Sequence, residues 1–128
     1  MPQRPSWQRE ALCRGIDTGL FYPERGANAV TREALRAACA ACPVRARCIE
    51  LAMPEHFGMF GGLSQRQRLW LRKRGVLAVA DGAVVTFDAA TSAVTVTRPR
   101  GSEVMTRYGA RLLLESLDGH RRPLAKSA

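Results

Sequence analysis

The sequence lacks the features of several common classes of protein. Its 128 residues contain no apolar run near the ~20 residues that cross a bilayer, so we expect no membrane span. The first ten residues contain no apolar segment typical of a signal peptide, so we expect a cytoplasmic protein. Aromatic residues make up only 6%, which limits the hydrophobic core. Chains with so small a core often need a metal or a covalent crosslink to fold.

Acidic residues are also scarce, and their scarcity is uneven. Residues 1–63 carry 8 basic and 6 acidic side chains, a net charge of +2, whereas residues 64–128 carry 12 and 5, a net charge of +7. This asymmetry favours a polyanionic partner for the second half, nucleic acid before membrane. A basic surface that serves only solubility is the alternative.

Four cysteines are present, and three of them fall within ten residues. Cys39, Cys42 and Cys48 follow the distant Cys13 in the pattern C-x25-C-x2-C-x5-C. Four thiolates suit a tetrahedral zinc ion or an iron–sulfur cluster, and the spacing leaves these two open. Two disulfides are a further alternative, but nothing in the sequence indicates an oxidising compartment. His56 and His120 have no ligand spacing relative to the cysteines, so we expect neither to bind metal.

Ordered motifs surround these cysteines. They are Trp7-Gln-Arg-Glu-Ala-Leu-Cys-Arg-Gly-Ile-Asp17, Leu20-Phe-Tyr-Pro23, Cys39-Ala-Ala-Cys-Pro-Val-Arg-Ala-Arg-Cys48, Gly58-Met-Phe-Gly-Gly62 and Ser64-Gln-Arg-Gln-Arg68. Over about residues 7–75 they resemble the WhiB-like family of actinobacterial and actinophage transcription regulators. The resemblance implies that the four cysteines hold a [4Fe-4S] cluster that responds to nitric oxide or oxygen. Arg45 and Arg47 could offset the negative charge of such a cluster, or could simply be solvated.

The glycine-rich segment Gly58–Gly62 predicts a turn with positive φ angles. The resemblance implies that this turn contacts region four of the principal sigma factor. The partner-binding residues that we predict are Phe21, Tyr22, Met59, Phe60, Gly61 and Gly62. Phe60 stands where the family usually has Trp, so the contact lacks an indole N–H donor. A turn that only closes the cluster pocket is the alternative.

A basic helix follows the turn. Ser64 and Gln67 form a capping-box pattern that starts a helix over 65–74, and Gly75 is its expected end. We predict phosphate contacts from its five cations rather than a plain solvated face. The linker after the second β-branched run adds two candidates, although it lacks the full Arg-Gly-Arg-Pro sequence of a minor-groove hook. The DNA-binding residues that we predict are therefore Arg66, Arg68, Arg72, Lys73, Arg74, Arg98 and Arg100.

The patterns predict a mainly α fold. We expect helices at 4–14, from the Thr31 cap to Cys39, and at 44–53 with Pro43 in the first turn. Together they would form a small helical bundle organised around a four-cysteine [4Fe-4S] cluster. A β-hairpin at 84–87 and 94–97 and a helix at 103–117, capped by Ser102, would form an α+β appendage.

The predicted last helix carries an apolar stripe of Met105, Tyr108, Leu112 and Leu113, which we expect to cover the hairpin. Residues 1–75 and 76–128 would thus be two units. The role of the second is open, and we expect its basic tail from His120 onward to be disordered.

The sequence therefore predicts a transcriptional regulator that binds promoter DNA and a sigma factor, with no small-molecule substrate. A thiol–disulfide oxidoreductase using Cys39 and Cys42 is one alternative, although no thioredoxin-like βαβ pattern precedes them. A structural zinc module is the other. We expect a protein that is not an enzyme.

Overall fold

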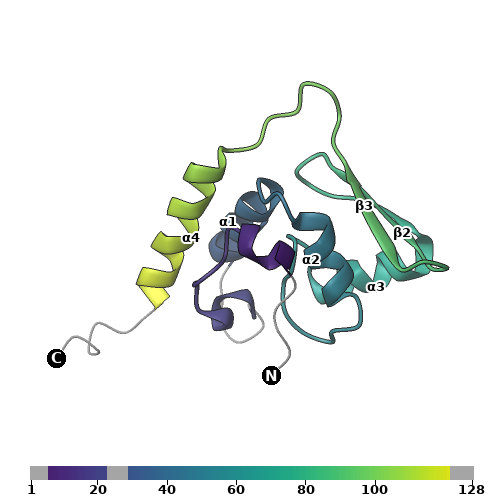
Figure 1. Ribbon diagram of the computed structural model, residues 1–128, viewed down its shortest axis with the longest axis horizontal. Helices are drawn as coiled ribbons and strands as arrows, with labels where there is room; N and C mark the ends of the chain where they lie inside the picture. Colours follow the sequence, from purple (N-terminus) through teal and green to yellow (C-terminus); the bar gives the residue numbers. More distant parts are fainter. Residues whose placement is uncertain (1–5, 23–28, 122–128) are drawn as a thin grey trace.

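The computed structural model describes residues 6–22 and 29–121 (Figure 1). Within these residues the chain forms two 3-10 helices, four α-helices and one three-stranded antiparallel sheet. The elements are η1 (Ser6–Glu10), η2 (Thr18–Phe21), α1 (Ala29–Ala40), α2 (Arg45–Ala52), α3 (Gln65–Arg74), β1 (Val76–Ala78), β2 (Val84–Asp88), β3 (Ala93–Thr97) and α4 (Arg107–Arg121). This agrees with the predicted α+β composition.

The first three predicted helices exist, but their bounds differ from those expected. The predicted helix at 4–14 is the short 3-10 helix η1 followed by a turn. Helix α1 already includes Thr31, so the prediction that this residue caps the helix is wrong, because the helical turn extends upstream to Ala29. Helix α2 begins at Arg45, so Pro43 lies in the preceding turn and not in the first helical turn. There the backbone N–H groups of Cys42 and Arg45 bond to carbonyls three residues back, which turns the chain between the two helices.

Helix α3 has the ends that the sequence predicts. The Ser64 hydroxyl accepts a hydrogen bond from the Gln67 backbone at 3.2 Å, and the Gln67 side chain accepts one from the Ser64 backbone at 2.9 Å. The capping box is therefore complete. Gly75 ends the helix in the left-handed conformation, with φ of 77°, and its N–H bonds to the Leu71 carbonyl.

The hairpin is confirmed, and a third strand joins it. Strand β2 pairs antiparallel with β3, with Val85 opposite Val96. Strand β1, which the prediction missed, pairs antiparallel with the other edge of β2. The turn between β1 and β2 contains Asp81 and Gly82, and Gly82 has a φ of 93°. An Asp-Gly pair after a short apolar run is a hairpin signal, so the sequence did contain a cue for β1.

Helix α4 differs most from its prediction. It begins at Arg107 rather than 103 and continues through Asp118 and Gly119 to Arg121. The Thr106 hydroxyl accepts a hydrogen bond from the Gly109 backbone at 3.0 Å, so Thr106 occupies the capping role predicted for Ser102. His120 and Arg121, which we expected to begin a disordered tail, belong to α4, and residues 122–128 lie outside the described part of the chain.

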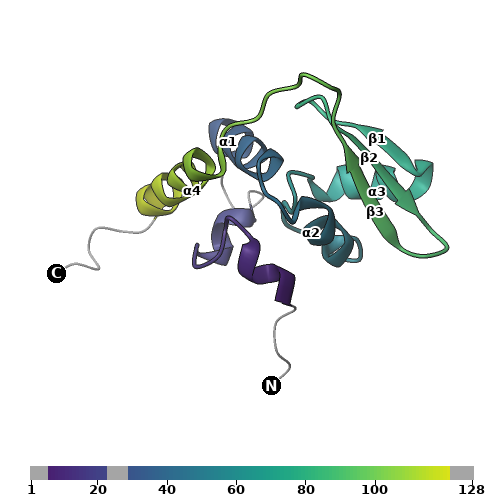
Figure 2. The same cartoon turned by 45° about the horizontal axis from the view of Figure 1, so that its top comes forward.

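The predicted contact between the last helix and the hairpin is wrong. Helix α4 lies beside α1, whereas the sheet lies against α2 and α3 on the other side of the molecule (Figures 1 and 2). The apolar side of α4 that packs on α1 differs from the predicted stripe. Of the predicted stripe, Met105 and Leu113 pack partly buried against the cluster around α1, whereas Tyr108 and Leu112 are exposed. Ala110 and Leu114, which the prediction did not include, are buried in that cluster.

Two hydrophobic clusters hold these elements together. One contains Leu35 and Met59 with Leu114 from α4, and the other contains Ile49 and Leu71 with Val85 from the sheet. Each cluster therefore combines residues from both sides of Gly75. The segment after Gly75 completes both cores in this structure. No helix in the described part of the chain is long and apolar enough to cross a membrane.

Candidate metal centre

The structure gathers all four cysteines around one cavity of about 510 Å³. Cys13 comes from the turn after η1, and Cys39 from the last turn of α1. Cys42 lies in the turn between the helices, and Cys48 lies in α2. The fold thus brings the distant Cys13 to the three clustered cysteines. All four thiols are free, and each residue keeps some exposed surface because it lines the cavity.

The thiols strongly influence one another. Burial raises the pKa of Cys39, and negative charge on Cys48 raises it further. Burial also raises the pKa of Cys48 to about 11, with a further contribution from Cys13. The pKa of Cys13 is raised first by burial and then by Cys42. These thiols therefore stay protonated at neutral pH unless a cation stabilises the thiolates.

The four cysteines line one shared cavity. In residues 6–22 and 29–121, no three His, Cys, Asp or Glu side chains form a group that could hold a metal ion. Four cysteines around one cavity suit the donor set of a cluster of several iron and sulfide ions.

The predicted glycine turn forms one wall of this cavity. Gly58, Gly61 and Gly62 all have positive φ angles, of 89°, 60° and 82°. A Cβ atom on Gly61 would lie 2.4 Å from a side-chain carbon of Ile49, so the turn can approach α2 only with glycine there. The backbone of Gly61 also forms a hydrogen bond that lowers the pKa of Cys48.

The predicted partner-binding residues divide into buried and accessible groups. Met59 is fully buried, and Phe21, Gly61 and Gly62 are also buried, so these residues belong to the interior. Tyr22 and Phe60 keep exposed surface, and their rings meet edge to face with centroids 5.9 Å apart. Phe57, which the sequence analysis did not select, lies beside the turn and is 65% exposed. No pattern in the sequence marked it.

The five cations of α3 do not form one surface. Arg66, Arg72, Lys73 and Arg74 are exposed, but Arg68 is only 1% exposed. Among the exposed cations, Arg72 has a hydrogen bond within the protein, because its Nη2 donates to the Met53 carbonyl at 2.7 Å.

Arg68 holds the glycine turn in place. Its Nη1 donates to the Gly58 and Leu63 carbonyls, both at 2.9 Å. Its Nη2 donates to the Phe57 carbonyl at 3.0 Å and to the Glu55 carbonyl at 3.3 Å. This guanidinium cannot reach a phosphate, so we correct its prediction as a DNA contact. Its charge lowers the pKa of Cys48, after the larger effects that raise it.

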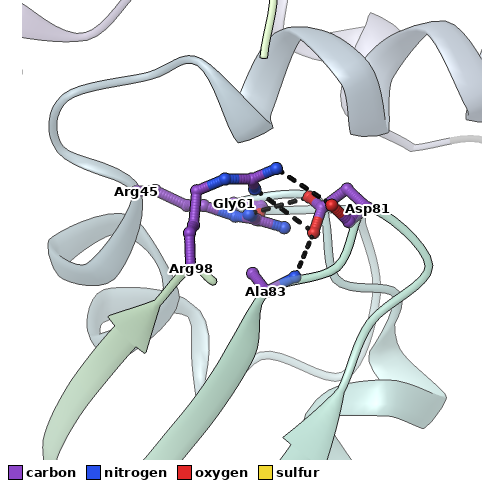
Figure 3. A network of polar contacts seen from close by, with 5 residues as sticks. All are labelled: Arg45, Gly61, Asp81, Ala83 and Arg98. Carbon is purple, nitrogen blue, oxygen red and sulfur yellow. Dashed lines mark hydrogen bonds and ion pairs between the residues drawn. The ribbon is translucent and has the colours of Figure 1, made fainter. Parts of the chain in front are cut away.

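A second buried arginine connects the cavity to the sheet (Figure 3). Arg45 lines the cavity and is 5% exposed. Its Nε donates to the Gly61 carbonyl at 2.7 Å, and its Nη1 lies 2.9 Å from Asp81 Oδ2 in the turn between β1 and β2. Arg98 forms an ion pair of 3.4 Å with the same carboxylate and donates to the Asp81 carbonyl at 2.9 Å.

The structure bears on the predictions made for four arginines. Arg45 lies where it can offset negative charge in the cavity, whereas Arg47 is exposed. Arg98 forms an ion pair with Asp81 and is therefore a poor candidate for a phosphate contact. Arg100 is exposed, as a linker contact to DNA requires.

Comparison with known proteins finds relatives of the part of the chain that contains the four cysteines. The family described as "Transcription factor WhiB" matches residues 7–71, which include all four cysteines and the glycine turn. The transcriptional regulator WhiB of Streptomyces coelicolor is 49% identical over 72 residues, which are 55% of this chain and 79% of that protein. WhiB2 of Mycolicibacterium smegmatis is 47% identical over 77 residues, covering 59% of this chain and 57% of its relative.

A third relative has a name that refers to redox chemistry. The redox-responsive transcriptional regulator WhiB3 of Mycolicibacterium smegmatis is 44% identical over 77 residues, which are 55% of this chain and 79% of that protein.

The family match ends at residue 71, before the sheet and α4. The match spans half of the chain, and with the site geometry it places this protein in the WhiB family of transcriptional regulators.

Proposed function

We propose that this protein is a transcriptional regulator whose four cysteines hold a [4Fe-4S] cluster. The observation that carries the proposal is the convergence of Cys13 with Cys39, Cys42 and Cys48 around one cavity. When bound, the cluster would supply reactivity toward nitric oxide or oxygen, and hence a signal. The names of the relatives, among them a redox-responsive regulator, support this role.

Two buried arginines fit the charge of such a cluster. Four thiolates leave a cluster with net negative charge, which is costly in a partly buried cavity unless cations lie nearby. Arg45 lines the cavity, and the charge of Arg68 is felt at Cys48. Both guanidiniums are fixed by backbone carbonyls, so they would offer oriented positive charge.

The fold disfavours the alternative of a thiol–disulfide oxidoreductase. The reactive cysteine of a thioredoxin-like C-x-x-C enzyme lies near a helix N-terminus within a βαβ pattern. Cys39 instead lies in the last turn of α1, and the strands of the described residues all follow it and form an antiparallel sheet. We therefore favour a regulator over an enzyme.

We propose that the accessible aromatic side chains beside the glycine turn dock on region four of the principal sigma factor. Tyr22 and Phe60 would form the centre of this surface, with Phe57 at its edge. Partly exposed aromatic anchors commonly dominate the energy of such interfaces. Arg66, Lys73 and Arg74 would then reach phosphates of promoter DNA.

An anaerobic binding measurement against purified sigma region four tests the proposal. We expect the iron-loaded protein to bind, and the Tyr22→Ala variant to bind more weakly with an unchanged cluster spectrum. The exposed Tyr108→Ala on α4 is a matched control, because Tyr108 lies away from the cavity wall. Equal affinity for the parent protein and the Tyr22 variant would overturn the proposed docking surface.

A further inference from the structure

Cys13 lies on a segment with little regular structure. It occupies a turn between η1 and η2, and 25 residues separate it from the next cysteine. Local backbone bonds around it include Arg14 N–H to the Ala11 carbonyl at 3.2 Å and Ile16 N–H to the Cys13 carbonyl at 3.0 Å. The other three cysteines lie in or directly between α1 and α2. Cys13 is therefore the ligand candidate that most needs support from elsewhere in the fold.

That support comes from α4, near the other end of the chain. The Arg111 Nη1 donates to the Leu12 carbonyl at 2.9 Å and also to the Arg14 carbonyl. These two carbonyls belong to the residues on either side of Cys13. One guanidinium thus holds both flanks of the cysteine, across about 100 residues of sequence.

Arg111 is itself held in position. Its Nε lies 3.3 Å from a Glu115 carboxylate oxygen one helical turn away. A Cβ atom on Gly15 would lie 3.8 Å from the Arg111 Nη2, so the guanidinium lies against the backbone of Gly15, directly after Arg14. The helix is anchored by Ala110 and Leu114, which are buried, and Leu114 also lines the cysteine cavity.

We propose that Arg111 is a positioning residue for the metal centre, which holds the Cys13 loop in the conformation that presents its thiol to the cavity. This role of Arg111 is additional to the proposed regulatory function and rests on it in one respect, that Cys13 is a metal ligand. Ordering a loop costs conformational entropy, and a fixed clamp removes most of that cost before the metal arrives. Helix α4 lies outside the residues that match the family, so this chain uses its own C-terminal segment to control how firmly one ligand is held.

A purely structural role for Arg111 would have a different signature. If it only helped α4 to pack on α1, its loss would loosen α1 and the Cys13 loop together. If it clamps the loop, residues 12–16 loosen while α1 stays protected. Amide hydrogen exchange can separate the two cases, because peptides from the two segments are analysed individually.

The test compares Arg111→Met with Arg107→Met in anaerobically prepared, metal-loaded protein. Arg107 lies on the same helix and is exposed, so it is a matched control. We expect residues 12–16 to exchange about tenfold faster in the Arg111 variant, as loss of hydrogen bonds from a charged donor predicts, with α1 unchanged. During removal of metal by a chelator, iodoacetamide should label Cys13 ahead of the other cysteines in this variant only.

Unchanged exchange at 12–16 together with an unchanged order of labelling would overturn the proposal. Equal loosening of α1 and the Cys13 loop would also overturn it in favour of simple packing. If Arg111→Met does not fold, Glu115→Gln supplies the test. Glu115 is exposed, and the substitution removes the negative charge of the carboxylate that orients the Arg111 guanidinium. That variant should give a smaller but equally selective effect. The metal content of the parent protein reports separately on the cluster, since the clamp acts on Cys13 whichever metal is bound.

Discussion

Replacing Asp81 with Asn should destabilise the protein by about 2–3 kcal/mol. The magnitude follows from the burial of its ion pair with Arg45, where the two side chains are 5% and 19% exposed. Breaking a fully buried pair costs about 3–5 kcal/mol, because a charge is left without its partner, whereas a surface pair is worth about 0–1. One buried and one partly exposed partner give a value between these limits.

The substitution is selective for charge. An Asn oxygen can still accept the hydrogen bond that the Ala83 backbone donates to Asp81 Oδ1 at 2.9 Å. The Asp81 carbonyl remains available to Arg98. What disappears is the negative charge that faces two guanidiniums (Figure 3).

Urea denaturation of metal-loaded protein without oxygen measures the difference in the free energy of unfolding. Asp88→Asn is the matched control, because Asp88 is an exposed residue of β2 whose Oδ1 also accepts a backbone hydrogen bond, from Ala90 at 2.9 Å. We expect the control to change stability by less than about 0.5 kcal/mol. If Asp81→Asn were no more destabilising than this control, the sheet would not be fastened to the cavity wall through Arg45.

Three further predictions concern the metal and the two partners. Cys13→Ala should lose most of the bound iron and part of the helical circular dichroism, because metal binding and folding are coupled; full iron retention would remove Cys13 from the ligand set. Phe60→Ala should weaken binding to sigma region four by about 2 kcal/mol with the cluster spectrum intact, and unchanged affinity would assign Phe60 to internal packing. Replacing Arg66, Lys73 and Arg74 together with Ala should reduce the slope of log affinity against log salt on duplex DNA by about 2–3, since each phosphate contact contributes about 0.9. An unchanged slope, measured with the sigma factor present, would leave these three side chains as a solvated surface.

Local signals in the sequence predicted the elements whose ends are fixed by local chemistry. Helix α3 has the predicted start at Ser64 and end at Gly75 because capping depends on residues within one turn. The hairpin consists of β2 and β3, which are the two β-branched runs that predicted it. The glycine turn has the positive φ angles that its composition indicates.

Long-range packing could not be predicted in the same way. Helix α4 covers α1, its partner in space, and the apolar side of α4 that includes Ala110 and Leu114 does not by itself identify that partner. The burial of Arg68 depends on four carbonyls in the segment 55–63, which no periodic pattern reveals. Asp81 and Arg111 act across gaps of dozens of residues, so their roles became visible only in the fold.

The metal content of the protein purified without oxygen tests the central claim most directly. Four cysteines around one cavity predict a brown protein with about four iron and four sulfide ions per chain. Its visible absorbance should bleach on exposure to nitric oxide. A colourless protein with one zinc ion per chain and no sulfide would contradict the account.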